Sequence, residues 1–238
     1  MKAEEKLVLA RFLDLSSDFL ASGYRQNRDD YVFNDNHKPA LPLAYTIEES
    51  EDNDSESIDG EGSQNPLVMV IGEGPGEEEE TTGRTFAGNA GQLLDRMLAS
   101  IGLYRSKNCF IAGLNKCRPP ENRGRELSET AACYPFLERQ ILLLRPLLIL
   151  CMGQAAAQGL LKTSEGIDTL RGKFTEIKIA ETVIPVLPTF HPDEILKDNR
   201  LKGPAWEDLL VLHSRLASMN KEYAAAACAA SSRGKPHA

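Results

Sequence analysis

One stretch of the sequence decides the fold: Leu67-Val68-Met69-Val70-Ile71-Gly72-Glu73-Gly74-Pro75-Gly76. A short apolar run that ends in a glycine-rich turn is typical of a buried strand in a parallel sheet. The turn after such a strand lies at the carboxyl edge of the sheet, where α/β folds bind their ligands. Glu73 is therefore a carboxylate at a candidate site, although glycines in such a turn can also serve loop geometry alone.

Apolar strands alternate with helical patterns along the rest of the chain. After the strand at 67–71 we expect strands at 109–115 and 147–152, and two further β-like runs within 173–187. The spacing of apolar residues predicts helices at 89–101, 128–143, 154–161 and 206–216. This alternation indicates an α/β fold in three layers, α/β/α, with a mainly parallel central sheet that is covered on both faces.

The composition indicates an intracellular protein with a substantial core. The chain has 238 residues, of which 42% are apolar, and no run reaches the ~20 apolar residues of a membrane span. The segment 1–6 lacks the order of a signal peptide, so we expect a cytoplasmic protein without a membrane partner. The five cysteines are odd in number and scattered, which argues against a disulfide framework.

The net charge of −8 comes from one segment. Eight acidic residues and no basic one lie between positions 48 and 61, and the remainder has 27 residues of each sign. We predict a disordered acidic linker at 48–65, either as an inert spacer or as a mimic of DNA charge. An amino-terminal helical extension at 1–47 would pack on the core, 66–219 would form the main domain, and 220–238 a disordered tail.

Three further segments fall on the same predicted edge of the sheet. Phe86 stands between glycines before a helix, where it can offer a ring face to a flat ligand or simply join the core. His191 follows the strand at 183–187 and precedes Pro192, a better position for meeting a ligand than most histidines have. A loop holds four basic residues that suit phosphate contacts, unless it is an ordinary solvated loop: Lys116, Arg118, Arg123 and Arg125.

Together these segments resemble the uracil-DNA glycosylase superfamily, most closely its family 4. Residues 72–94 follow the family's first motif almost throughout, with Thr85 in place of the usual proline. A Lys-Cys-Arg-Pro-Pro-x-Asn-Arg motif stands at 116–123, a His-Pro motif at 191–192, and 201–209 resembles the family's last helix. The likeness covers about 66–216, and it implies a central sheet of four strands.

The resemblance implies a monomeric repair enzyme that cuts the N-glycosidic bond of deoxyuridine in DNA, releasing uracil and leaving an abasic site. Glu73 would activate the attacking water, and His191 would stabilise the departing uracil anion. The basic residues of the 116–125 loop would hold the DNA backbone. The resemblance also implies base-pocket roles, namely stacking on Phe86, contact with the backbone at Gly74 and rejection of the thymine methyl group by Glu79.

The first departure from the family concerns its iron–sulfur cluster. Family 4 members usually hold a [4Fe–4S] cluster on four cysteines, and Cys117 and Cys133 match the second pair. No cysteine precedes Cys109, so the first pair is missing, and a cubane cluster needs four thiolates. We expect Cys109 and Cys151 to pack as small apolar side chains. We therefore predict no cluster and no other metal.

The second departure concerns the asparagine that reads the base. The family usually carries it where this chain has Ala112-Gly113, and Asn115 is the nearest substitute, with Asn89 or backbone groups as alternatives. Two other functions stay open for this reason. One is a glycosylase for another deaminated base, such as hypoxanthine or xanthine, and the other is a damaged-DNA-binding protein without catalysis.

Overall fold

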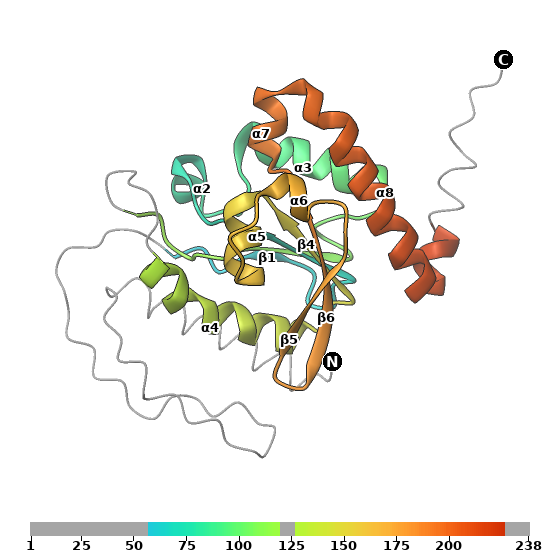
Figure 1. Ribbon diagram of the computed structural model, residues 1–238, viewed down its shortest axis with the longest axis horizontal. Coiled ribbons are helices and arrows are strands. Elements are labelled where there is room, and N and C mark those ends of the chain that lie inside the picture. Colours follow the sequence, from blue (N-terminus) through green and yellow to red (C-terminus); the bar gives the residue numbers. More distant parts are fainter. Residues whose placement is uncertain (1–56, 120–126, 227–238) are drawn as a thin grey trace.

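The computed structural model describes residues 57–119 and 127–226. Within these ranges a single sheet lies between two groups of helices (Figure 1). The strands are β1 (Glu61–Gly62), β2 (Val68–Gly72), β3 (Cys109–Gly113), β4 (Leu148–Met152), β5 (Thr175–Ile179) and β6 (Thr182–Thr189). The helices are α2 (Glu77–Thr82), α3 (Gly88–Ser100), α4 (Leu127–Leu144), α5 (Gln154–Leu161), α6 (Ile167–Leu170), α7 (Pro192–Lys197), the short 3-10 helix η3 (Asn199–Leu201) and α8 (Lys202–Met219).

The sheet has the strand order β1-β3-β2-β4-β6-β5. The four central strands, β3, β2, β4 and β6, are parallel, and the two edge strands are antiparallel to their neighbours. The predicted three-layer fold and its parallel centre are confirmed. The expected count of four strands describes that centre only, because the short β1 and the β5–β6 hairpin add an antiparallel strand at each edge.

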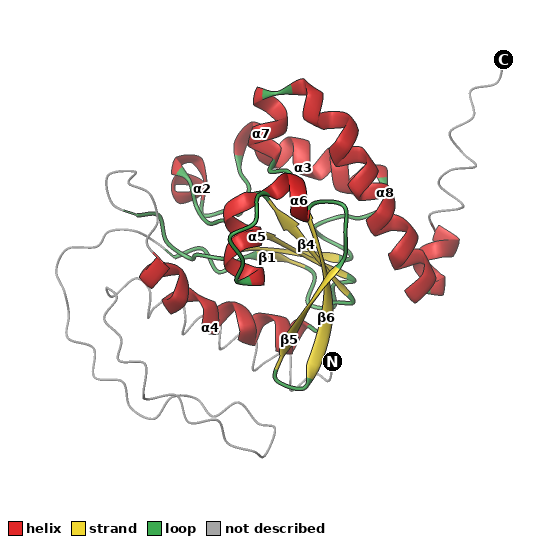
Figure 2. Cartoon of the chain, viewed as in Figure 1, coloured by secondary structure: helices red, strands yellow, loops and turns green. Residues whose placement is uncertain are grey.

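Alternate residues of the central strand enter opposite layers of the core. Val68 and Val70 pack with α3 and α8, whereas Met69 and Ile71 pack with α4 and α5. Successive side chains of a strand point to opposite faces, so a strand that is apolar at every position must be covered on both sides. Figure 2 shows this arrangement, with α4 and α5 on one side of the sheet and α3, α7 and α8 on the other.

Two of the predicted domain boundaries are wrong. The segment 57–65 was expected to be linker, but Ile58 is buried and β1 pairs with β3. The segment 220–226 was expected to be tail, but 221–226 is helical and Tyr223 is buried against the core. In both places one apolar residue anchors the backbone within a stretch whose composition is mainly polar or small. The expectations for 1–47, 48–56 and 227–238 fall outside the described residues.

The described ranges, 57–119 and 127–226, contain no helix with both the length and the apolar character needed to cross a lipid bilayer.

Candidate active site

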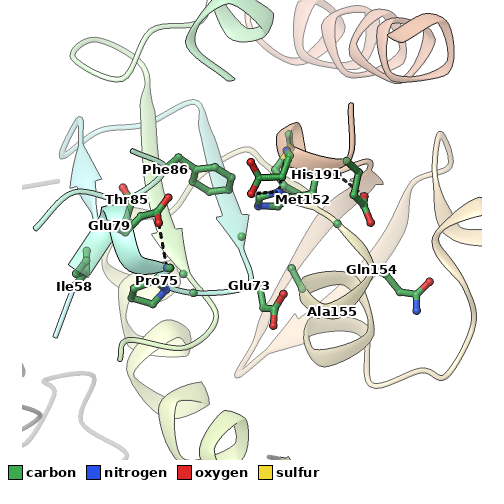
Figure 3. Close-up of a pocket in the computed structure, with 18 of the residues that line it drawn as sticks. Ile58, Glu73, Pro75, Glu79, Thr85, Phe86, Met152, Gln154, Ala155 and His191 are labelled. Atoms are coloured by element: carbon green, nitrogen blue, oxygen red, sulfur yellow. Dashed lines mark hydrogen bonds and ion pairs between the residues drawn. The ribbon is translucent and has the colours of Figure 1, made fainter. Parts of the chain in front are cut away.

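A cavity of about 420 Å³ opens at the carboxyl edge of the parallel strands (Figure 3). Its wall combines the turn after β2, the loop before α3, the start of α5 and the start of α7. Glu73, Phe86 and His191 all line it, although they are far apart in the sequence. The predicted convergence of three loops on one space is therefore what the structure shows, and the volume is typical of a ligand site.

The loop that carries Glu73 continues the pairing of β2 with β3 beyond the sheet. Gly72 is in register with Gly113, the Leu114 N–H donates to the Gly72 carbonyl at 2.8 Å, and the Asn115 N–H donates to the Glu73 carbonyl at 2.9 Å. Gly74 has a φ of 152° and packs so closely that a Cβ on Gly113 would lie 2.9 Å from its Cα. Glycine is needed at both positions for this approach.

His191 caps the amino terminus of α7. Its backbone N–H donates to the Glu194 carboxylate at 3.0 Å, and the Asp193 N–H donates to its Nδ1 at 3.2 Å. Pro192 at the first helical position fixes the backbone that follows. Because Nδ1 accepts a hydrogen bond, a neutral His191 carries its proton on Nε2.

The surroundings of His191 favour the neutral ring. Removal from water lowers the pKa of His191, and this effect outweighs the opposing influence of nearby carboxylates, first among them Asp193. The Asp193 carboxylate lies 3.6 Å from Nδ1, which would favour an imidazolium, but the backbone N–H already occupies that nitrogen. The site therefore holds a neutral imidazole with an N–H free to act as a hydrogen-bond donor.

Phe86 stacks on His191, with ring centroids 5.2 Å apart and an angle of 23° between the planes. Figure 3 shows this ring pair, with the Glu73 carboxylate lying toward Ala155. A Cβ on Gly72 would lie 2.5 Å from the Phe86 ring, so the glycine at the end of β2 makes room for it. Phe86 has a φ of 52°, a left-handed conformation that few residues other than glycine adopt.

Arg105 holds this strained loop, a role that no local sequence pattern indicates. Its guanidinium donates to the carbonyls of Thr85 at 2.6 Å and Phe86 at 3.1 Å. Glu61 of β1 and Asp95 of α3 balance its charge, each at 2.5 Å. Unusual backbone conformations persist where surrounding contacts over-determine them, and Arg105 provides such contacts here.

Glu79 ties two parts of the cavity wall together. One carboxylate oxygen accepts from the Gly76 N–H at 3.1 Å and the other from the Ala87 N–H at 3.0 Å. The side chain thus links the turn after β2 to the loop of Phe86. Because both oxygens are held by backbone donors, this carboxylate has a fixed position at the edge of the cavity.

The profile of the Uracil DNA glycosylase superfamily matches residues 60–210, a range that contains every residue of the cavity described so far except Ile58. The chain belongs to the uracil-DNA glycosylase superfamily.

Curated relatives in this superfamily cover most of the same range. A type-4 uracil-DNA glycosylase of Saccharolobus solfataricus is 40% identical over 68% of this chain and 77% of its own. A type-4 uracil-DNA glycosylase of Pyrobaculum aerophilum is 36% identical over 64% of this chain and 80% of its own. One from Thermotoga maritima is 38% identical over 63% of this chain and 78% of its own.

Two predicted base contacts do not line the cavity of this superfamily member. Asn89 is exposed at the start of α3, and Asn115 is buried beneath the turn that carries Glu73. Gly113, which occupies the position where family 4 usually has asparagine, does line the cavity. A side chain there would collide with the Asn115 carbonyl at 2.5 Å, so the wall at this point is backbone.

The predicted DNA contact of Lys116 is wrong. Lys116 is completely buried, and its ammonium donates to the carbonyls of Asp59 and Gly113, both at 3.2 Å, and to Gln140 Oε1 at 2.7 Å. Burial lowers its pKa to about 8. Its charge is therefore used inside the protein, where three oxygens replace water, and no phosphate can reach it.

Arg118 has different surroundings from Lys116. Arg118 is partly buried and pairs with Glu80 at 2.7 Å and Glu77 at 3.5 Å, both in α2. Its guanidinium therefore lies next to the helix that follows the Glu73 turn. Arg123 and Arg125 lie outside the described residues.

The cysteines of this chain do not fit the cubane cluster of family 4. As expected, Cys109 and Cys151 are fully buried in β3 and β4. Among the described residues that leaves Cys117 and Cys133, and the Lys116 N–H donates to Cys133 Sγ at 3.5 Å. Cys228 lies outside the described residues. Burial raises the pKa of the Cys117 thiol to about 12, which disfavours the thiolate that a metal needs. Within the described ranges, no group of three or more histidine, cysteine or acidic residues could hold a metal ion.

Proposed function

We propose that this chain is a monofunctional uracil-DNA glycosylase that hydrolyses the N-glycosidic bond of deoxyuridine in DNA. The observation that supports it most is the placement of Glu73, Phe86 and His191 on one cavity, in a chain 35–40% identical to five type-4 uracil-DNA glycosylases. The enzyme turns the nucleotide out of the duplex, because the bond cannot be reached inside the base stack.

Glu73 acts on the sugar side of the bond. As the bond between C1′ and the uracil nitrogen breaks, its electron pair leaves with the base and positive charge develops at C1′. The Glu73 carboxylate orients a water molecule for attack on C1′, accepts its proton and offsets the developing charge. The new bond joins the water oxygen to C1′, so the products are an abasic site and free uracil.

His191 acts on the base side. The departing uracil carries negative charge that is shared by its N1 atom and its two carbonyl oxygens. The neutral imidazole, whose Nδ1 is held by the Asp193 N–H, donates from Nε2 to the oxygen where that charge gathers. A donor fixed before the reaction stabilises the transition state without reorganising at the moment of bond cleavage.

Three further groups select and hold the base. Phe86 provides the aromatic surface for stacking, and backbone groups at Gly74 and Gly113 face its edge. Glu79, fixed by two backbone donors, stands where it excludes the methyl group of thymine. Arg118, together with Arg123 and Arg125 of the same sequence motif, contacts the DNA backbone, which requires Arg118 to exchange its carboxylate partners for phosphate.

We further propose that the enzyme works without an iron–sulfur cluster. Only Cys117 and Cys133 match ligand positions of the family's cluster, and two thiols cannot supply the four ligands of a cubane. Purification without added iron should give a colourless, active protein with less than one iron per chain by elemental analysis. A brown protein with stoichiometric iron would contradict this proposal and leave the proposed reaction intact.

A second candidate function is excision of another deaminated base, such as hypoxanthine or xanthine. The glycine wall at position 113 favours it, because no side-chain amide at that point restricts the cavity to uracil. A damaged-DNA-binding protein without catalysis is a third possibility, but nothing in the structure favours it over a glycosylase.

Labelled oligonucleotides that carry uracil, hypoxanthine, xanthine or no lesion separate these functions. Alkali cleaves the strand wherever a base has been excised. Breaks confined to the uracil strand support the proposal, and breaks at a purine lesion support the second function. Retained binding without breaks supports the third.

We also propose that the protein is a cytoplasmic monomer. Sedimentation of the pure protein checks its oligomeric state.

A further inference from the structure

Asn115 stands out as a buried polar side chain that the proposed chemistry does not use. It is only 4% exposed and lies just beyond the carboxyl end of β3. Its Oδ1 has no hydrogen-bond partner among the described residues. A buried acceptor without a partner destabilises a fold, so its presence calls for a reason other than packing.

The other end of the same amide makes one well-defined contact. Nδ2 donates to the carbonyl oxygen of Glu73 at 3.1 Å, and the backbone N–H of Asn115 donates to the same oxygen at 2.9 Å. The carbonyl oxygen of Glu73 thus accepts two hydrogen bonds from one residue. The next residue, Gly74, has a φ of 152°, and nothing in a glycine's own conformational preference keeps the turn in this shape.

We propose that Asn115 is a positioning residue that fixes the backbone of Glu73, and through it the carboxylate that directs the attacking water. This inference rests on the proposed function of Glu73. The amide at this position lowers the stability of the fold, because a leucine of nearly the same shape would leave no buried acceptor without a hydrogen bond. Sites of this kind exchange stability for activity.

Asn108 provides a matched control. Its side-chain Nδ2 also donates to a backbone carbonyl at 3.1 Å, that of Gly102, but it lies before the amino end of β3, away from the cavity. Its Oδ1 is satisfied by the Tyr104 N–H at 2.7 Å. Asn108 therefore makes the same contact as Asn115 for a purely structural purpose.

The test compares Asn115→Leu with Asn108→Leu in single-turnover and steady-state uracil excision and in thermal unfolding. Asn115→Leu should lower kcat about fivefold or more, the equivalent of one hydrogen bond, with KM unchanged and Tm equal to or above that of the wild type. Asn108→Leu should lower Tm by roughly 2–4 °C or more and leave kcat unchanged. A falling Tm in Asn115→Leu, or an unchanged kcat, overturns the inference.

Asn115→Asp supplies a second readout that a purely structural role would not produce. Its carboxylate cannot donate to the Glu73 carbonyl, but the carboxylic acid can, and burial raises the pKa of such a group. The ratio of its kcat to that of the wild type should therefore rise as pH falls. A ratio that is constant with pH contradicts the inference, whereas a wild type that excises no uracil contradicts the proposed function instead.

Discussion

Two regions at the same end of the sheet differ in how far they match the family pattern. The catalytic edge, formed by Glu73, Phe86 and His191, has these three family residues in place and brings them to one cavity. The cysteine corner, which we define as Lys116, Cys117 and Cys133, keeps two of the family's cluster cysteines without the other pair. Both regions border the same strand ends, yet the cysteine corner lacks half of the ligand set that the family pattern has there.

The difference shows what each region requires. At the catalytic edge the backbone is strained at Phe86, and the side chains of Glu73 and His191 line a cavity. At the cysteine corner the ammonium of Lys116 joins Asp59, Gly113 and Gln140, so the segment before β2 is held to α4 by hydrogen bonds. A structural connection can be made by any bonds of sufficient strength, whereas the reaction needs specific groups at specific positions.

The largest effect should follow from Glu73→Gln. The amide keeps the shape but cannot accept a proton from water or balance charge at C1′, so kcat should fall on the order of 10³-fold. Single-turnover excision measures it, with the exposed Glu176→Gln of β5 as control. A loss of kcat below about tenfold would contradict the proposed catalytic role of Glu73.

His191→Ala should lower kcat on the order of 10²-fold, the usual effect of removing one preorganised donor. Because burial lowers the pKa of His191 below its ordinary 6.5, the wild type should stay active as pH falls through that value. The Asp193 carboxylate raises this pKa, so Asp193→Asn should move any histidine-dependent acid limb of the pH–rate profile to lower pH. Activity that is instead lost as pH rises through the pKa of His191 would show that the imidazolium is the active form.

Gln140→Leu should have its main effect on stability. It removes the 2.7 Å acceptor of a buried ammonium and a donor to the Asp59 carbonyl, so unfolding in urea should become easier by about 2–3 kcal/mol. The exposed Gln92→Leu of α3 should change stability by no more than about 0.5 kcal/mol. Equal stabilities in these two variants would show that the Lys116 network does not hold the corner together.

The same network predicts a dependence of stability on pH. Burial lowers the pKa of Lys116 from 10.5 to about 8. Between these values the unfolded chain keeps a proton that the folded chain has lost, so the free energy of unfolding should rise with pH across this window relative to Lys116→Met. Urea unfolding at the two ends of the window measures the rise, and a fall would mean that the folded state binds the proton more tightly.

The contrast between the two regions also explains how far the sequence could be interpreted. The runs at β2 and β4 and the helix at 154–161 were predicted closely, because apolar periodicity is local. The convergence at the cavity followed from the rule that parallel strands present their carboxyl ends at one edge. The short β1 was missed because a two-residue strand inside an acidic run has no pattern of its own.

The errors at the cysteine corner have a different origin. Lys116 was assigned to the surface from its charge alone, but its acceptors on Asp59 and Gln140 lie 57 and 24 residues away in the sequence. Asn115, next to this corner, was assigned to the base as the nearest substitute for the family's asparagine, whereas its side chain donates to the carbonyl of Glu73, 42 residues earlier. Contacts of this kind depend on tertiary packing, so no local sequence pattern predicts them.

The smallest effect should come from the cysteines that match cluster ligands. Without a cluster, Cys133→Ala removes one buried sulfur and one weak acceptor, so it should cost about 1 kcal/mol, much like Cys151→Ala in β4, whose side chain is also buried. Cys117→Ala should cost less, since that side chain is only partly buried. A ligand of a structural metal group would behave otherwise, because its loss forfeits binding energy that contributes to folding. If either variant at positions 117 or 133 lost several times more stability than Cys151→Ala in urea unfolding, the corner would be a metal site, and its resemblance to the relatives would extend beyond the catalytic edge.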